Sequence, residues 1–557
     1  MTNSRQFDTS IESLPVEWQL LQLFEDCNKV YSQFPHFSEL LRQGFLGISG
    51  ESSWQAGHKW LMDFRREYLF LPLFPLSVES GDESIRAAAS ATAQKCEGMF
   101  RRDLSALKLV GVPVSRRHLR AIELVRLVCS GYEITCPLSS KAPAEMPECD
   151  ILAAMARMID EKWWRGQLRK LHARYLENAA RQLGLVCKRK GGYCSSITLS
   201  RRRIQKKRNQ GLLENLLAEN DQGQVYTLDE LSDMGVSNPV NRRNELMARI
   251  SGFERFADAD ADIEWQAVFI TATCPSKFHS HNRGGIRNKR WDGSTPRDAQ
   301  KYLSKVWSLV RSKWQKAGVS RFGFRIAEPH HDGCPHWHLL LWIPKDQVDH
   351  AMSIYRLYSL AMDGEERGAD LRRFRFDLID SDAGSATGYI SKYISKNVDG
   401  LTADGESWSS DSVRTAWRVE AWASTWGLRQ FQQIGGASVT VWRELRRLSV
   451  PESNEQLEAI RLAADDGDWS EYTRLMGGPT VGRDDQPIRS MMIVVSDKTN
   501  AYGEAIRRLW GLVVLGLDEV QTRVREWTIS SARDVPAFAA IALGGAGETG
   551  PPLDLCQ

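Results

Sequence analysis

Alternation of apolar and polar positions predicts two neighbouring strands in the middle of the chain. From His336 to Ile343, every second side chain falls on the same face, because successive residues of a strand point to opposite sides. His336 and His338 therefore share the leading end of an otherwise apolar strand. Upstream, residues 321–328 alternate well enough for a second strand that ends at Glu328. The short stretch between them contains Asp-Gly and flanking prolines, which are typical of a turn, so the strands are predicted to be antiparallel neighbours.

Helical periodicity dominates the chain on both sides of these strands. Residues 1–185 are predicted to be mainly helical, with a clearly amphipathic stretch at 114–128. Thr295-Pro296 predicts the cap and first turn of a helix that Gly318 ends. Residues 454–476 are again predicted to be helical, and short strand-like pieces follow them. Together these patterns predict an α+β protein.

Breaks in the patterns predict five parts in the 557-residue chain. We expect a helical N-terminal region, a basic linker or DNA-contacting segment, a central domain that contains the paired strands, a smaller mixed accessory region and a disordered tail. Their predicted ranges are 1–185, 186–238, 239–450, 451–540 and 541–557.

The paired histidines and Glu328 are candidate metal ligands. Two imidazoles and one carboxylate, with coordination positions left open, are typical of a catalytic metal site. An isolated His-x-His is more often two unrelated polar residues, and His279-Ser280-His281 is predicted to be such a case, a solvated or phosphate-contacting loop. Oxygen ligands favour Mg²⁺, whereas two imidazoles shift the preference toward Mn²⁺, so both metals stay open.

A second candidate site is the segment 388–397, which contains two tyrosines one helical turn apart. On a helix, Tyr389 and Tyr393 are surface neighbours, and Lys392 and Lys396 fall on the same side. For an isolated pair, ordinary half-buried packing would be the better interpretation. Two lysines beside the tyrosines instead suit a phosphate passing over the helix.

These motifs, taken in order, resemble the rolling-circle initiators of the HUH endonuclease superfamily, and most closely the bacteriophage replication gene A protein family. The resemblance covers roughly residues 240–450. The blocks that carry it are Asn244–Phe253, Phe269–Thr273 with its continuation to His279, Glu328–His338, Tyr389-x-x-x-Tyr393-x-x-Lys396, and Gln433–Leu445.

The resemblance implies a central domain with a five-stranded antiparallel sheet flanked by helices, in which strand 265–273 lies beside the histidine strand. It also implies a metal-dependent enzyme that nicks a phage replication origin, forms a covalent 5′-phosphotyrosine link and rejoins the strand after a round of synthesis. Tyr389 and Tyr393 would be the nucleophiles, and Lys396 would offset charge on the phosphate or phenolate.

Charge and composition define the expected partners. The net charge is only +3, so clusters of basic residues, at 188–208 and 283–290, rather than bulk charge, predict binding to DNA phosphates. Ten scattered cysteines favour reduced thiols. No signal-peptide pattern, membrane-length apolar run or Gly-x-x-x-x-Gly-Lys-Ser/Thr motif occurs. We therefore expect action on single-stranded or origin DNA in the host bacterial cytoplasm, with no membrane or ATP site and with a host replicative helicase as partner.

Two alternatives remain open at the level of the sequence. The first is a metal-dependent nuclease that uses water and has merely structural tyrosines. The second is a non-catalytic origin-binding protein in which the histidines and Glu328 hold a structural ion.

Overall fold

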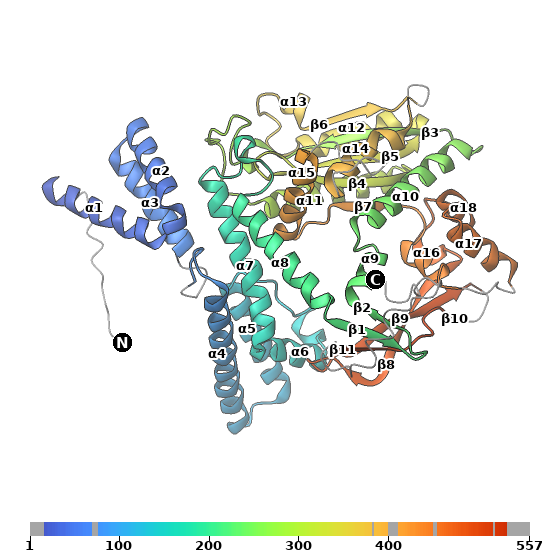
Figure 1. Cartoon of the computed structure of the whole chain (residues 1–557), viewed down its shortest axis with the longest axis horizontal. Coiled ribbons are helices and arrows are strands. Elements are labelled where there is room, and N and C mark those ends of the chain that lie inside the picture. The colour runs from blue at the N-terminus through green and yellow to red at the C-terminus, as the bar shows by residue number, and fades with distance from the viewer. Residues whose placement is uncertain are drawn as a thin grey trace. The chain divides into compact units, whose positions relative to one another are not determined.

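The computed structural model describes residues 16–69, 76–380, 384–398, 410–448, 454–515 and 519–531 (Figure 1). The described residues form two compact units. The first contains those up to Leu185 together with 497–506, and the second contains the remainder. The predicted tail, 541–557, lies outside the described residues.

The first unit is helical, as the amphipathic patterns predict. Asp160 accepts hydrogen bonds from two backbone N–H groups at the start of the last helix, which satisfies donors that a helix N-terminus leaves free. Residues 497–506, from the C-terminal part of the chain, also belong to this unit. Within this segment, Glu504 pairs with Arg157, and the Tyr502 hydroxyl donates a hydrogen bond to Asp160. The helices are α1 (Val16–Gln33), α2 (Ser38–Glu51), α3 (Trp54–Leu69), α4 (Asp82–Leu109), α5 (Val114–Gly131), α6 (Glu148–Ile159) and α7 (Glu161–Gln182).

The second unit begins with a basic helix, α8 (Ser196–Leu213), in the segment predicted as a linker or DNA contact. Ser195 caps α8 by accepting a hydrogen bond from a backbone N–H. A two-pronged ion pair between Arg202 and Glu420 joins α8 to α15 (Ser410–Trp426). A small sheet with strand order β11-β1-β2 follows. Its elements, with the adjoining helix, are β1 (Leu216–Asn220), β2 (Val225–Thr227), β11 (Trp527–Ser531) and α9 (Leu228–Met234).

A five-stranded sheet forms the centre of the second unit and confirms the predicted fold. Its strand order is β6-β3-β5-β4-β7, and every neighbouring pair is antiparallel. The predicted histidine strand is central and lies between the other two predicted strands. The strands are β3 (Trp265–Ala272), β4 (Phe322–Pro329), β5 (Pro335–Pro344), β6 (Phe374–Leu378) and β7 (Phe431–Ile434).

Each face of this sheet packs against its own hydrophobic core, because the central strands are apolar on both sides. Leu340 and Trp342 point into one core, and Trp337, Leu339 and Leu341 point into the other, as the alternation predicts. The first core is covered by α10 (Pro239–Ala259), α14 (Ala386–Val398), α16 (Val439–Leu445), α17 (Glu455–Asp465) and α18 (Trp469–Leu475). The second core is covered by α11 (Pro296–Lys316) and α12 (Val348–Leu360), and the short α13 (Ala369–Arg372) precedes β6.

Helix α11 begins and ends where its sequence predicts. The Thr295 hydroxyl accepts from the Asp298 backbone N–H, and the Asp298 carboxylate accepts in return from Thr295, which forms a reciprocal capping box. At the other end, Gly318 adopts a left-handed conformation, φ 70°, which glycine reaches without the steric cost of a side chain.

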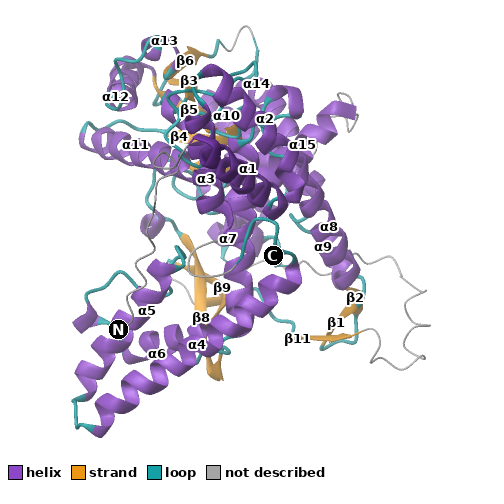
Figure 2. Cartoon of the chain, turned by 90° about the vertical axis from the view of Figure 1, so that its left-hand side faces the viewer, coloured by secondary structure: helices purple, strands orange, loops and turns teal. Residues whose placement is uncertain are grey.

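The C-terminal part contains a second three-stranded sheet, with strand order β10-β9-β8. Figure 2 shows β8 and β9 as a long two-stranded ribbon. The strands are β8 (Ile488–Thr499), β9 (Ala505–Val514) and β10 (Glu519–Gln521). Helices α17 and α18 followed by strand β8 match the mixed pattern predicted for this region. Within the described part of the chain, no helix combines the length and apolar character that crossing a membrane requires.

Candidate active site

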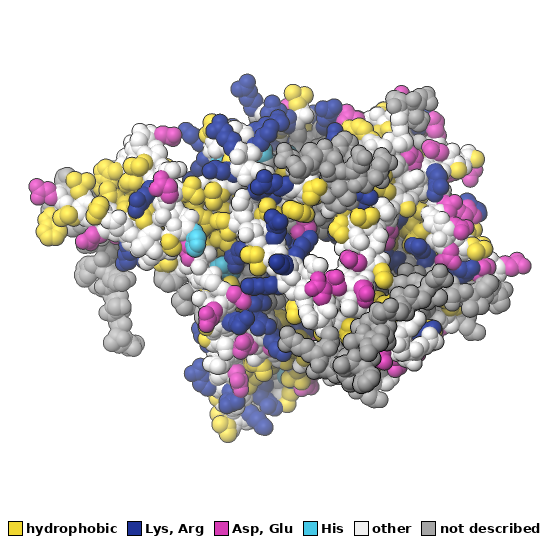
Figure 3. Space-filling model, in the orientation of Figure 1, with side chains coloured by type: hydrophobic (Ala, Val, Ile, Leu, Met, Phe, Trp, Pro, Cys, Tyr) yellow, Lys and Arg dark blue, Asp and Glu magenta, His cyan; other side chains and the backbone are white. Residues whose placement is uncertain are grey.

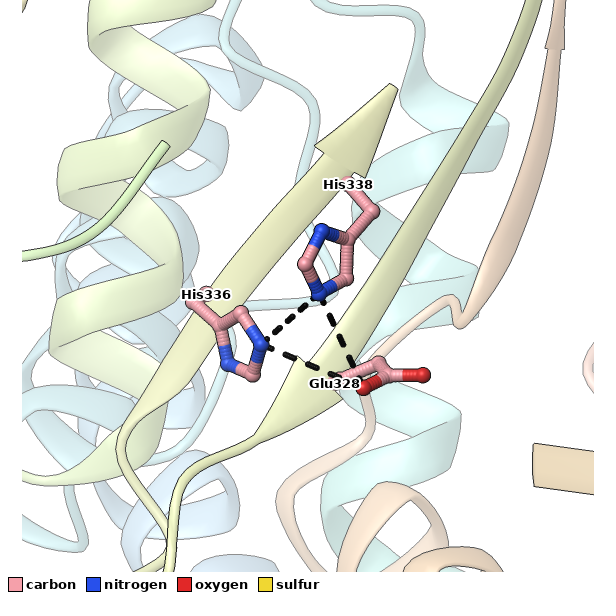
Figure 4. A group of neighbouring side chains, drawn as sticks. All are labelled: Glu328, His336 and His338. Carbon is pink, nitrogen blue, oxygen red and sulfur yellow. Dashed lines mark hydrogen bonds and ion pairs between the residues drawn. The ribbon is translucent and has the colours of Figure 1, made fainter. Parts of the chain in front are cut away.

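The Glu328, His336 and His338 side chains converge at one end of the central sheet (Figure 4). Glu328 on β4 pairs across the antiparallel register with His336 on β5, and His338 follows two residues later on the same face. The two Nε2 atoms are 3.0 Å apart. Glu328 Oε2 lies 3.9 Å from His336 Nε2 and 3.8 Å from His338 Nε2. The structure therefore brings together the three ligands that the sequence predicts.

This donor set fits a divalent cation. All three ligand atoms lie within 4.8 Å of one another. An ion with metal–ligand bonds of about 2.1 Å separates two right-angled ligand atoms by about 3.0 Å, which is the distance between the imidazole nitrogens. Glu328 is 2% exposed and His338 is 7% exposed, and buried ionisable groups in such proximity need compensation from a counter-charge. With only three protein ligands, an ion held here would keep positions free for water or substrate.

Neighbouring polar groups orient two of the predicted ligands. The Thr271 hydroxyl on β3 lies 3.1 Å from His338 Nδ1, so the ring presents Nε2 to the cluster when Nδ1 carries the proton. Thr271 is placed there because it pairs with His338 in the β3–β5 register. The Asn397 side-chain amide on α14 donates a hydrogen bond to Glu328 Oε1, which leaves Oε2 facing the imidazoles.

The two tyrosines lie on α14 beside this cluster. Ile390 and Ile394 are fully buried in the first core, which fixes the rotation of the helix. Tyr393 is thereby held with its ring centroid 4.6 Å from that of His338. Tyr389 is 45% exposed, and its ring centroid lies 6.3 Å from that of Tyr393. The predicted tyrosines are thus adjacent to each other, and Tyr393 is also adjacent to a predicted ligand.

Phe269 on β3 packs among these rings. Its centroid lies 4.7 Å from Tyr389, 5.2 Å from Tyr393 and 5.3 Å from His338, on which it stacks. Phe269 is 2% exposed, so it forms an apolar floor that limits the positions of both phenols. Phe269 belongs to the motif block 269–273, but the block alone did not predict a role for it. The signal was available, because the β alternation puts Phe269 and Thr271 on one face.

The environment of Tyr393 disfavours its ionised form. Burial, followed by the nearby Tyr389 and Glu328 groups, raises the pKa of Tyr393 to about 12. The phenol is therefore protonated in the free protein at neutral pH, and attack through its oxygen needs a nearby group or ion that stabilises the phenolate.

Lys392 and Lys396 are the two lysines that follow the tyrosines on α14. Lys392 is exposed on α14. The Lys396 side chain lies outside the described residues, so its place beside a phosphate stays a prediction.

The loop containing His279 and His281 differs from the predicted solvated segment. Ser280 and His281 are buried, and the fully buried Asp332 carboxylate accepts from the Ser280 backbone N–H at 2.9 Å and lies 3.2 Å from His279 Nδ1. The sequence pattern was misleading because Gly, Asn and Arg around the histidines suggested exposure. Asp332, in the turn between β4 and β5, instead draws the loop inward by satisfying its polar groups.

His330 connects this loop to the three predicted ligands, Glu328, His336 and His338, here called the metal-ligand cluster. Its ring stacks on His336 at a centroid distance of 4.1 Å and meets the His279 ring at 5.1 Å. Burial, reinforced by the neighbouring His279, lowers the pKa of His330 to about 3. A neutral imidazole therefore packs against His336, one of the predicted metal ligands.

Comparison with known proteins identifies the relatives of this chain. The model of the family described as bacteriophage replication gene A protein matches residues 113–401, just over half of the chain. The replication gene A protein of Escherichia phage 186 is 39% identical over 401 residues, which cover 70% of this chain and 57% of the relative. The replication protein of Haemophilus phage HP1 is 37% identical over 387 residues, which cover 68% and 49% respectively.

A further relative from a bacterial genome carries a more explicit name. The Salmonella typhi protein named "Probable replication endonuclease from prophage-like region 1" is 33% identical over 410 residues, covering 70% of this chain and 50% of the relative. The chain thus spans about half the length of the curated relatives it matches. No solved structure matches it significantly.

Proposed function

The chain belongs to the bacteriophage replication gene A protein family, and from this premise we propose that it is an origin-nicking and rejoining DNA endonuclease. It cuts one strand at a phage origin through a tyrosine, keeps the cut end as a 5′-phosphotyrosine and reseals it after a round of rolling-circle synthesis. The observation that carries the proposal is the position of Tyr393, whose ring lies 4.6 Å from the ligand His338.

Glu328, His336 and His338 would hold the required Mg²⁺ or Mn²⁺. When bound, such an ion withdraws charge from the scissile phosphate and orients its oxygens. The protein contributes the orientation of its own ligands through Thr271 and Asn397.

The proposed reaction exchanges one phosphodiester for another. A tyrosine oxygen attacks phosphorus, the Tyr O–P bond forms, and the P–O3′ bond of the DNA breaks. The phenolic proton leaves the tyrosine, and the departing 3′-oxygen gains a proton to become a 3′-hydroxyl that can prime synthesis. Because the number of phosphodiester bonds is unchanged, the reverse transfer to a 3′-hydroxyl needs no ATP. Lys396, one turn beyond Tyr393, would offset charge that develops on the phosphate or phenolate.

The second tyrosine gives the site a second nucleophile. Tyr389 and Tyr393 lie on the same helix with ring centroids 6.3 Å apart, so the two phenols can serve one phosphate position in turn. This arrangement supports a second transfer after one circuit of the template, by which one protein molecule cuts, holds and closes a circle.

The substrate proposed is single-stranded or origin DNA. Figure 3 shows Lys and Arg side chains gathered along the position of α8. Exposed residues of this helix include Arg203, Lys206, Lys207 and Arg208, and the Arg203 guanidinium lies over the exposed Trp417 ring at 4.7 Å. Cationic groups interleaved with an aromatic ring suit the phosphates and bases of single-stranded DNA. A host replicative helicase would open the duplex inside the bacterial host.

The decisive experiment uses a labelled single-stranded origin oligonucleotide incubated with the protein and Mn²⁺, then separated on a denaturing gel. We expect label to migrate with the protein. Tyr389→Phe and Tyr393→Phe, made singly and together, identify the linked residue, and the double variant should form no adduct. A free 5′-phosphate without an adduct would indicate a nuclease that uses water. Binding without strand scission would indicate a non-catalytic origin-binding protein.

A further inference from the structure

A pocket of about 420 Å³ lies beside the catalytic sheet, between α10 and α16. We call it the α10–α16 pocket. Its principal polar lining comprises Asn244, Glu245 and Arg249 from α10, with Arg443, Arg446 and Arg447 from α16 and the turn that follows it. These residues belong to, or adjoin, two motif blocks, 244–253 and 433–445, that contribute nothing to the metal-ligand cluster or the tyrosine pair. The fold therefore brings together two motifs whose role the proposed chemistry leaves open.

Positive charge exceeds negative charge in the α10–α16 pocket. Glu245 accepts a two-pronged ion pair from Arg443, at 2.9 and 3.0 Å, and pairs with Arg249 at 3.2 Å. Arg447 pairs with the fully buried Glu444 at 3.2 Å. Two carboxylates thus pair with three of the four lining arginines, and Glu444 is shared further with Arg523. An anion in the pocket would match the remaining positive charge.

Arg446 is exposed, and among the residues that the structure describes no carboxylate lies within ion-pair distance of its guanidinium. Its guanidinium is therefore available to an external ligand. A planar guanidinium can donate two parallel hydrogen bonds to a phosphate, which makes arginine well suited to phosphodiester recognition.

The crowding of arginines is reflected in the protonation of Arg249. Burial, together with repulsion from Arg443, Arg242 and Arg429, lowers the pKa of Arg249 to about 10, although Glu245 opposes this shift. Arg249 remains charged at neutral pH, at a free-energy penalty that a bound anion would reduce.

The pocket lies along the same face of the sheet as the metal-ligand cluster. The Arg249 guanidinium is 5.8 Å from the centre of the Phe324 ring, and Phe324 precedes Glu328 by four residues on β4. At about 3.3 Å per strand residue, the backbone positions of Phe324 and Glu328 are about 13 Å apart. Between these levels, Arg242 lies over the ring of Phe431 at 5.3 Å, and Phe431 pairs with Ile326, two residues from Glu328. Arg249 and Arg242, here called the arginine row, thus lead from the pocket toward the cluster.

We propose that the α10–α16 pocket binds the phosphodiester backbone of the single DNA strand flanking the cleavage site, with Arg446 as an external phosphate contact. This inference rests on the proposed endonuclease function, since it assigns the flank of that same substrate to a place on the protein. Continuity with the arginine row favours a polynucleotide over a free nucleotide or a small anion.

Arg446→Glu tests this assignment against a matched control, Arg356→Glu. Arg356 is also exposed and also lacks an ion pair among the described residues, but it lies on α12, which covers the opposite core. Both variants make the same charge change. Binding is measured by fluorescence anisotropy with a labelled origin oligonucleotide in the absence of divalent metal. Arg446→Glu should bind about tenfold more weakly, and the slope of its log binding constant against log salt concentration should be smaller in magnitude by about one. Arg356→Glu should bind like wild type.

Shortening the oligonucleotide locates the contact. Removing nucleotides from one flank should weaken wild-type binding, and the same shortening should weaken Arg446→Glu less, because the deleted phosphates and Arg446 then belong to one interaction. Equal losses in both charge variants, or no loss in either, would overturn the proposal. Competition by inorganic phosphate, with no dependence on flank length, would instead identify a small-anion site and also overturn it.

Adduct formation by the wild-type protein is measured separately on the denaturing gel. Absence of the adduct would reject the proposed endonuclease function, whereas the anisotropy comparison would still decide whether the pocket contacts the strand.

Discussion

The Asn397 amide donates a hydrogen bond to Glu328 Oε1, so the helix that carries both tyrosines also holds the carboxylate of the metal-ligand cluster. Asn397 follows Tyr393 by four residues, one helical turn. A movement of α14 that displaces the phenols would therefore also disturb Glu328. This contact couples the proposed nucleophiles to the proposed metal ligands through one rigid element.

Asn397→Ala should impair metal binding more than maximal turnover. The substitution leaves Glu328 without the contact that directs Oε2 toward the imidazoles, and loss of such outer contacts typically weakens metal affinity about 10- to 100-fold. The rate of adduct formation is measured as a function of Mn²⁺ concentration. Ser391→Ala, which alters the same helix away from Glu328, provides the control. An unchanged Mn²⁺ requirement for Asn397→Ala would contradict this positioning role.

Mn²⁺ should stabilise the folded protein, and chelation should reverse the effect. An ion that binds the folded state at about 100 times its Kd adds about 2.7 kcal/mol to the free energy of unfolding. Thermal unfolding is followed with and without Mn²⁺ for wild type, Glu328→Gln and His338→Ala. The two ligand variants should lose most of the increase in Tm. His350→Ala, an exposed histidine on α12, should keep it, and an undiminished increase in the ligand variants would exclude this ligand set.

The His279–Asp332 pair should make stability depend on pH. Burial lowers the pKa of His279, but the Cys334 and Asp332 groups outweigh burial and raise it well above the usual value. Burial also raises the pKa of Cys334, so that thiol is neutral and Asp332 supplies the charge. Because the pKa of His279 is raised in the folded state, the stability that the His279–Asp332 pair adds is fully present below the unfolded pKa of about 6.5. It is lost as the pH rises through the pKa of His279 in the folded protein.

The free energy of unfolding of wild type and of His279→Gln is measured from pH values below about 6.5 to values well above it. Wild type should be more stable than the variant at low pH, and the difference should shrink as the pH rises. His350→Gln, which removes an exposed histidine, should produce no such trend. A difference that grows with pH would reverse the predicted sign.

Gly323→Ala should destabilise the central sheet strongly. Gly323 on β4 has φ 146°, and a Cβ added there would overlap the backbone carbonyl of Leu340 on β5. Since both backbones belong to ladder strands, neither can yield cheaply, and we expect a loss of about 3 kcal/mol or more. Gly318→Ala also places a side chain at positive φ, but in the left-handed region and with open space around the new methyl group, so it should cost about 1 kcal/mol. Chemical denaturation compares the two, and equal losses would remove the steric argument.

The sequence determined the local elements and the chemistry they carry. Strand alternation put His336 and His338 on one face, and the intervening turn made Glu328 the cross-strand neighbour of His336. Helical spacing put Tyr389 and Tyr393 one turn apart and gave Ile390 and Ile394 a separate buried stripe. These features follow from the periods of a strand and a helix, which depend only on neighbouring residues.

Only the tertiary structure decided which distant residues meet. The contact of Asn397 with Glu328 spans 69 residues, and the inward turn of the His279 loop depends on Asp332, 53 residues away. The arginines of the α10–α16 pocket come from helices separated by nearly two hundred residues. Such contacts are set by how helices pack on the two faces of the sheet, a global property that no local periodicity encodes.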